Sequence, residues 1–231
     1  MSLAARKIRL IMQLRRSGIS DTGVLAAIER IPREAFVPRP FLDQAYENRT
    51  LPIGHGQTLS QPRVVALMTQ ALGLARRHKL LEVGTGSGYQ AAVLSRLVRR
   101  VYTVERHRAL LREAERRFAE LRLHNVVTRL GDGSRGWKEQ APFDRIIVTA
   151  AAAEVPRALL DQLCVDGVLV APIGPDRGEQ ELLRITRLTD GERRESLGPV
   201  RFVPLIAGAL PGEPNGQGAA DAALPEGHSP A

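Results

Sequence analysis

Three segments of the chain end in groups that could hold a nucleotide-like ligand. The first carries Glu82-Val-Gly-Thr-Gly-Ser-Gly88, the second ends at Glu105, and the third ends at Gly131-Asp-Gly133. Glycines let a backbone turn sharply and bring main-chain N–H groups close to a ligand. The carboxylate of Glu105 could accept both hydroxyls of a ribose, and that of Asp132 could accept the exocyclic amine of an adenine. Each carboxylate alone is more often a helix cap or a solvated turn residue, but the aligned set favours a ligand site.

The spacing of the glycines counts against a nicotinamide or flavin cofactor. Gly84, Gly86 and Gly88 form G-x-G-x-G, and Tyr89 occupies the place of the third glycine in a dinucleotide fingerprint. The ligand is therefore expected to be another adenosine-type molecule.

These groups need a sheet that brings their strand ends to one edge. Apolar strands are predicted at 79–83, 100–104, 126–130, 144–149 and 167–172, with helices at about 62–75, 88–98, 107–122 and 155–164 and later strands at 181–188 and 200–205. Regular alternation of strand and helix is typical of βαβ units and a parallel sheet, which binds ligands at the carboxyl ends of its strands. We predict an α/β, Rossmann-like fold whose central sheet is mainly parallel, with helices on both faces.

The chain divides into three regions of one structural domain. Residues 1–60 are expected to hold amphipathic N-terminal helices, the second capped by Ser20 or Asp21, and then a long Pro-punctuated loop that covers the site. Residues 61–208 form the core. Residues 209–231 are rich in Gly, Pro and Ala and are predicted to be a disordered tail.

The formal charge of +8 invites a nucleic-acid partner, but the composition weakens that interpretation. Aromatic residues make up only 4% of the chain, so few rings could stack on bases. The positive charge is concentrated in residues 61–130, largely on predicted helices. A basic helix surface that faces solvent explains this charge more simply than a site for a polyanion does. The single cysteine cannot form an internal disulfide, and no apolar run reaches membrane-spanning length. We expect a cytoplasmic protein without a membrane or nucleic-acid partner and without a metal.

The glycine turn and the two strand-end carboxylates together resemble the cofactor site of Rossmann-like methyltransferases. The resemblance implies S-adenosyl-L-methionine as the methyl donor and S-adenosyl-L-homocysteine as the product. It assigns the cofactor contacts to Glu82, Gly84, Thr85, Gly86, Ser87, Gly88, Glu105, Asp132 and Gly133.

A second stretch, Leu51-Pro-Ile-Gly-His-Gly-Gln-Thr-Leu-Ser-Gln-Pro62, is similar to the protein-L-isoaspartate O-methyltransferase family. The similarity continues through Phe143–Ala151 and Val200–Leu205 and covers about residues 24–206. It implies methylation of the free α-carboxylate of isoaspartyl residues in proteins and peptides. The ester then closes to a succinimide, which reopens partly as normal aspartate. We expect the protein to be a monomer. The resemblance places Ser60 at the reacting carboxylate, Thr58, Leu59 and Gln61 at the cofactor, and Gln57, Val203, Pro204 and Leu205 beside the substrate peptide.

Three alternatives stay open at this point. Ser60 precedes Gln-Pro and an apolar run, so by spacing alone it is a good N-cap for a helix whose first turn contains Pro62. A nucleic-acid methyltransferase is a second possibility, although Thr149–Ala153 lacks the Asn/Asp-Pro-Pro-aromatic run that would grip a flipped base. The third is a catalytically silent relative that binds the cofactor and docks to a partner.

Overall fold

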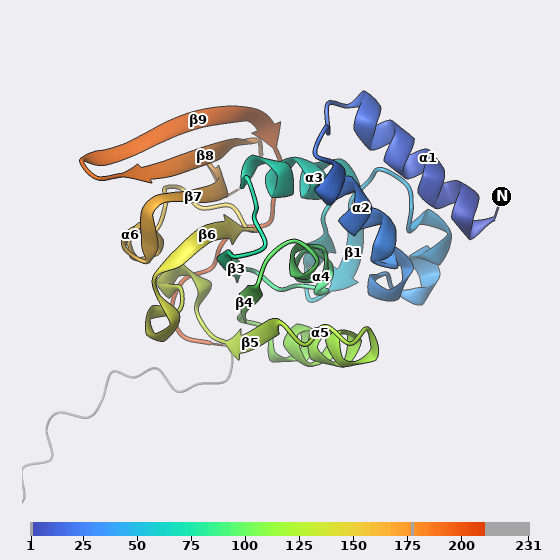
Figure 1. Ribbon diagram of the computed structural model, residues 1–231. Helices are drawn as coiled ribbons and strands as arrows, with labels where there is room; N and C mark the ends of the chain where they lie inside the picture. Colours follow the sequence, from blue (N-terminus) through green and yellow to red (C-terminus); the bar gives the residue numbers. More distant parts are fainter. Residues whose placement is uncertain (1, 177, 211–231) are drawn as a thin grey trace, which may run out of the picture.

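A single seven-stranded sheet organises the protein in the computed structural model, which describes residues 2–176 and 178–210 (Figure 1). Its strands lie in the order β5-β4-β3-β6-β7-β8-β9. The first five are parallel to one another, whereas β8 is antiparallel to both of its neighbours. The bounds are β3 (Lys79–Val83), β4 (Arg100–Glu105), β5 (Val126–Leu130), β6 (Phe143–Val148), β7 (Leu163–Ile173), β8 (Gln180–Leu188) and β9 (Gly191–Val200).

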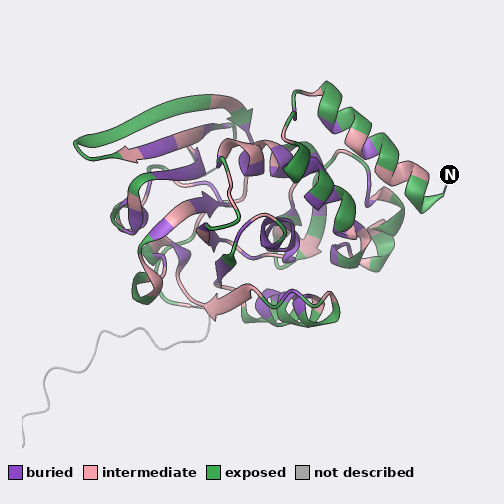
Figure 2. Cartoon of the chain, in the orientation of Figure 1, coloured by how far each residue is buried: buried purple, intermediate pink, exposed green. Residues whose placement is uncertain are grey.

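The predicted α/β fold with a mainly parallel sheet and helices on both faces is confirmed. Successive residues of the buried strands point to opposite faces, so that Leu80 joins one apolar core and Leu81 the other. The first core packs against α1 (Leu3–Arg16), α2 (Thr22–Arg30), α3 (Pro62–Ala71), α4 (Tyr89–Ser95) and α5 (Arg108–Glu120); the second packs against α6 (Arg157–Asp161). Figure 2 shows both layers of buried residues on either side of the central strands.

The strand order reverses between β3 and β6. From β3 the chain proceeds outward through β4 and β5, and then returns to place β6 and β7 on the other side. Loops leaving the carboxyl ends of β3 and β6 therefore diverge, and open α/β sheets bind their ligands at such a point.

The N-terminal region folds largely as expected. Asp21 caps α2 by accepting the backbone N–H groups of Gly23 and Val24, as one of the two predicted caps. The Pro-punctuated stretch is ordered: it contains two 3₁₀ helices, η1 (Arg33–Phe36) and η2 (Arg39–Gln44), and an antiparallel hairpin of β1 (Leu51–Gly54) and β2 (Gln57–Leu59). The hairpin lies close to α4, beside the carboxyl ends of the central strands (Figure 1).

Two predicted elements at the C-terminal side are wrong. The strand expected at 200–205 is absent, and the last strand is instead β9, which pairs with β8 over Gly191–Val200. The helix predicted at 155–164 is only the short α6, because β7 already begins at Leu163, which pairs with Phe143 of β6. Most of the predicted tail, 211–231, lies outside the described residues. Within the part that the structure describes, no helix is long and apolar enough to cross a membrane.

Candidate functional site

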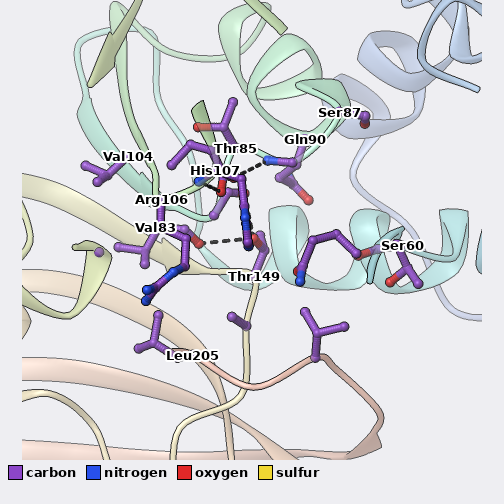
Figure 3. Close-up of a pocket in the computed structure, with 18 of the residues that line it drawn as sticks. Ser60, Val83, Thr85, Ser87, Gln90, Val104, Arg106, His107, Thr149 and Leu205 are labelled. Atoms are coloured by element: carbon purple, nitrogen blue, oxygen red, sulfur yellow. Dashed lines mark hydrogen bonds between the residues drawn. The ribbon is translucent and has the colours of Figure 1, made fainter. Parts of the chain in front are cut away.

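A cleft lies where the strand order reverses, and several separate segments line it (Figure 3). It is continuous with solvent and holds about 820 Å³ of empty space when the open solvent at its mouth is included. The β1–β2 hairpin contributes Gln57–Ser60, the turn after β3 contributes Gly84–Ser87, and the end of β4 contributes Glu105–His107. Further walls come from Gly133, from Thr149 and Ala150, and from residues 203–206.

The glycine turn between β3 and α4 is held in a conformation that other residues rarely adopt. Gly84, Gly86 and Gly88 have φ angles of +98°, +53° and +92°. A Cβ atom on Gly84 would lie 2.4 Å from Oγ1 of Thr149, which donates hydrogen bonds to the carbonyl oxygens of Gly84 (2.7 Å) and Val83 (3.0 Å). Backbone atoms of the turn can therefore face a ligand directly.

The Glu105 carboxylate fixes the turn and lines the cleft. Its Oε2 accepts the backbone N–H of Gly86 at 2.8 Å, and its Oε1 accepts that of His107 at 2.9 Å. Each carboxylate oxygen retains a second lone pair, so both could still accept a hydroxyl. The imidazole of His107 also lines the cleft, and its Nε2 is buried without a partner among the described residues. These groups fit a ligand that carries several hydrogen-bonding atoms, such as a ribose.

Asp132 does not line the cleft. Its Oδ1 accepts both the backbone N–H and the hydroxyl of Ser134, and its Oδ2 accepts the backbone N–H of Gly208. Burial acts to raise the pKa of this carboxyl, but these hydrogen bonds outweigh burial and the pKa is lowered. The carboxylate thus fastens the segment after residue 206 across the end of β5. Its contact with an adenine stays a prediction.

Glu82 lies beneath the glycine turn and is fully buried. Its Oε2 accepts the hydroxyl of Thr103 at 2.5 Å, and Thr103 is in turn 2.6 Å from the hydroxyl of Thr85. Burial raises the pKa of Glu82 to about 8, and the nearby Glu105 adds to the rise, while the Thr103 hydrogen bond opposes it. The side chain is therefore neutral at pH 7 and supports the turn from below.

Replacing Glu82 with glutamine is expected to change how stability depends on pH. The carboxyl pKa rises from 4.5 to about 8 in the fold. Stability is therefore fully present below pH 4.5 and is lost as the pH rises toward 8, because the unfolded chain ionises this carboxyl in that range while the folded protein holds it neutral. The loss reaches up to about 5 kcal/mol at about 1.4 kcal/mol per pKa unit. Urea unfolding of wild type and Glu82→Gln from pH 5 to 9 measures it.

The variant should lose most of the decline seen in wild type and become relatively more stable at pH 8. Glu29→Gln is the matched control, because Glu29 is an exposed carboxylate on α2. Parallel pH profiles for wild type and Glu82→Gln would contradict the assignment of a buried neutral carboxyl.

Ser60 is not the N-cap of α3, contrary to the expectation from spacing alone. The cap is Gln61, whose carbonyl accepts the backbone N–H groups of Val64 and Val65. The side chain of Asn48 accepts the N–H of Arg63, and Pro62 at the first position has none to satisfy. The Ser60 hydroxyl makes no hydrogen bond with the described residues. It is thus free to meet a substrate.

A buried arginine holds the backbone of Ser60. Nη2 of Arg33 donates to the Ser60 carbonyl at 2.8 Å, and its guanidinium lies 4.7 Å from the ring centroid of Tyr89. Arg33 is fully buried, and burial lowers the pKa of its guanidinium. The cation–π contact and the carbonyl bond tie the loop before α3 to the first turn of α4.

A second hollow adjoins the cleft on the other side of Ser60. It contains about 870 Å³ of empty space, open to solvent. Thr58 and Ser60 line both hollows. Its other lining residues are Thr50, Gln61, Arg63, Val64, Glu179, Pro199, Val200, Arg201 and Phe202. We call this second hollow the groove.

Most residues that the sequence predicted for the site meet in the cleft. These are Gln57, Thr58, Leu59, Ser60, Gly84, Thr85, Gly86, Ser87, Glu105, Gly133, Val203, Pro204 and Leu205. Four do not line it: Gln61 faces the groove, Glu82 and Asp132 lie as described above, and Gly88 packs against Phe118. Sequence reasoning did not assign Val65, Val83, Tyr89, Gln90, Val104, Arg106, His107, Thr149, Ala150 and Ile206 to the site.

Residues 203–205 form no regular strand, but one side of this segment is bridged to the chain after β6. Val203 accepts the N–H of Ala151 through its carbonyl, and Leu205 donates its N–H to the carbonyl of Ala151. Pro204 is bridged to Ala151. The segment is therefore attached to the chain just after β6, and it lines the cleft. Arg106 secures its far end by donating to the carbonyls of Ile206 and Ala209. Among the described residues no cluster of His, Cys, Asp or Glu is suited to a metal ion.

Comparison with known proteins gives one consistent result. The family model of protein-L-isoaspartate(D-aspartate) O-methyltransferase matches residues 5–209. A protein-L-isoaspartate O-methyltransferase of Rhodospirillum centenum is 66% identical over 94% of this chain and 99% of its own length. The Rhodospirillum rubrum protein of the same name is 64% identical over 91% and 97%.

Solved structures agree with the sequences. One protein-L-isoaspartate O-methyltransferase superposes with a TM-score of 0.78 and 30% identity, covering 88% of this chain and 66% of that one. A Plasmodium falciparum structure described with the same activity, in complex with S-adenosyl-L-homocysteine, gives a TM-score of 0.75 and 26% identity over 86% and 97%. The chain belongs to the protein-L-isoaspartate(D-aspartate) O-methyltransferase family.

Proposed function

We propose that the protein transfers a methyl group from S-adenosyl-L-methionine to the α-carboxylate of L-isoaspartyl residues, with the cofactor in the cleft and the peptide in the groove. The observation that carries this assignment is the shared wall. Thr58 and Ser60 line both hollows, so that a donor on one side and an acceptor on the other would meet at the Ser60 hydroxyl. A transferase with two substrates needs such a junction.

The cleft has the groups that the cofactor needs. Glu105 would accept the ribose hydroxyls through its remaining lone pairs, and the backbone of Gly84–Ser87 would face the methionine part. Apolar Leu59, Val65 and Val104 complete the walls, together with the unpartnered imidazole nitrogen of His107. When bound, S-adenosyl-L-methionine supplies a methyl group on a positively charged sulfur, and S-adenosyl-L-homocysteine is left after transfer.

The acceptor needs little chemical activation. A carboxylate is already ionised at neutral pH, so no general base has to remove a proton. The protein's tasks are to align the oxygen with the methyl group and to exclude water. The Ser60 hydroxyl would donate to the carboxylate and hold it in line. Arg33 would keep Ser60 in place through its carbonyl. The methyl ester then closes to a succinimide without the enzyme, and the succinimide opens partly to normal aspartate.

Transfer of labelled methyl groups to an isoaspartyl peptide tests this function, with the matching aspartyl peptide as control. We expect label only in the isoaspartyl peptide, in a form that base releases as methanol because the product is an ester. Equal labelling of both peptides, or of neither, would overturn the assignment. Label on a nucleic acid would favour the rival methyltransferase instead, although Thr149–Ala153 offers no group to grip a base.

Two further properties belong to the proposal. We infer that the protein acts as a monomer, because one chain supplies both the cleft and the groove; light scattering should give about the chain mass of 25.3 kDa. The single cysteine, Cys164, supports a reducing compartment and hence the cytoplasm, because no internal disulfide can form. Fractionation of cells that express the protein would test the location.

A further inference from the structure

The groove carries a pair of arginines whose charges are available to a ligand. Arg63 lies in the first turn of α3, and Arg201 follows β9. Both side chains are exposed, and neither guanidinium forms an ion pair with a described residue. Glu179 is the one acidic residue on the described wall, so the lining carries a net positive charge.

The walls that carry these arginines are fixed. The backbone N–H of Arg63 donates to the side-chain oxygen of Asn48. The backbone carbonyl of Asn48 accepts a hydrogen bond from the side-chain amide of Gln61. Beside Arg201, the N–H of Phe202 donates to the side chain of Gln180 at 2.9 Å, and Gln180 donates to the carbonyl of Pro175. The backbone that carries the two charges is therefore held in place, with Ser60 on the same wall.

We propose that Arg63 and Arg201 select isoaspartyl substrates whose flanking residues are acidic. This inference rests on the proposed function and adds the class of peptide that the groove prefers. A residue beside the isoaspartyl group must pass through the groove when the carboxylate is at Ser60. An acidic flank would meet two unpaired guanidinium groups, whereas a basic flank would meet repulsion. The positive charge would act through these two side chains rather than through the total charge of the protein.

The experiment compares kcat/KM for two sets of isoaspartyl peptides that differ only in Glu or Lys at the positions on either side. For the wild type at low salt we expect the Glu peptides to be preferred about fivefold or more, given the usual strength of exposed ion pairs. The preference should shrink as salt rises, because exposed charges are screened. The double variant Arg63→Glu/Arg201→Glu should prefer the Lys peptides.

A matched control separates local from total charge. Arg9→Glu/Arg112→Glu makes the same change in net charge at exposed helix positions outside the groove. It should keep the wild-type preference, and both double variants should bind S-adenosyl-L-homocysteine like wild type, which verifies folding. Equal rates for Glu and Lys peptides, or an equal shift in both double variants, would overturn the proposal while leaving the methylation itself intact. If wild type methylates none of these peptides, the proposed function has failed and this inference fails with it.

Discussion

Replacing Ser60 with alanine is expected to lower kcat by about 100- to 1,000-fold, as for the loss of one well-placed hydrogen-bond donor in an active site. The affinity for S-adenosyl-L-homocysteine should be nearly unchanged. Both expectations follow from position: Ser60 lies on the wall shared by cleft and groove, and its hydroxyl has no partner among the described residues. Single-turnover methylation of an isoaspartyl peptide and calorimetric titration of S-adenosyl-L-homocysteine measure the two quantities.

The Ser60→Ala variant should be as stable as wild type, so that a change in its kcat can be assigned to the reaction. Because Gln61 rather than Ser60 caps α3, alanine removes no capping bond, and the melting temperature should stay at the wild-type value. A loss of turnover would therefore reflect the reaction rather than a frayed helix. Ser60→Thr keeps a hydroxyl and should retain part of the rate. Ser20→Ala makes the same change at an exposed position and should keep the wild-type rate. Near-normal turnover of Ser60→Ala would remove the hydroxyl from the mechanism.

The fold was predictable from sequence wherever burial dictated residue type. A parallel strand that is covered on both faces must be largely apolar, and β3, β6 and β7 each contain such a run at 80–81, 146–148 and 168–171. The glycine turn was recognisable because its backbone angles require glycine. The edge strand β9 was not predicted, because most of its residues are polar and exposed. Glu192–Glu195 are charged and exposed, as is common at sheet edges, and they carry no apolar alternation for a reader to find.

The candidate site was predictable to the extent that it follows strand ends and one long motif. Contacts between distant segments were not. The hydroxyl of Thr149, just after β6, touches the glycine turn from 65 positions further along the chain, and Arg33 reaches Ser60 from η1. No local pattern distinguishes Arg33 from Glu34 beside it, although one is fully buried and the other is not. Asp132 shows the converse: its position at a strand end was right, but nearby hydrogen-bond donors determine what it contacts.

Changing Gly84 to alanine is expected to combine two costs, strain and overpacking. The φ angle of +98° strains any residue with a Cβ, which costs about 1–3 kcal/mol. The new atom would also lie 2.4 Å from Oγ1 of Thr149, and such overpacking costs about 1–3 kcal/mol more. Thr149 cannot rotate away freely, because its hydroxyl bonds the carbonyls of Gly84 and Val83. Chemical denaturation should show a loss of about 2–6 kcal/mol.

The variant should also bind S-adenosyl-L-homocysteine at least about 10-fold more weakly, because the shifted turn weakens its backbone contacts with the ligand. A loss of about 1.4 kcal/mol in binding free energy gives that factor. Gly18→Ala isolates the strain, since Gly18 has a φ of +94° and nothing within 4 Å of its Cβ position. It should cost less stability and leave affinity unchanged. Thr149→Ala added to Gly84→Ala removes the clash but not the strain, so the double variant should be more stable than the two single losses predict. Simple additivity, or equal losses for Gly84→Ala and Gly18→Ala, would mean that Thr149 does not confine the turn, and the close approach of backbone to ligand would then need another cause.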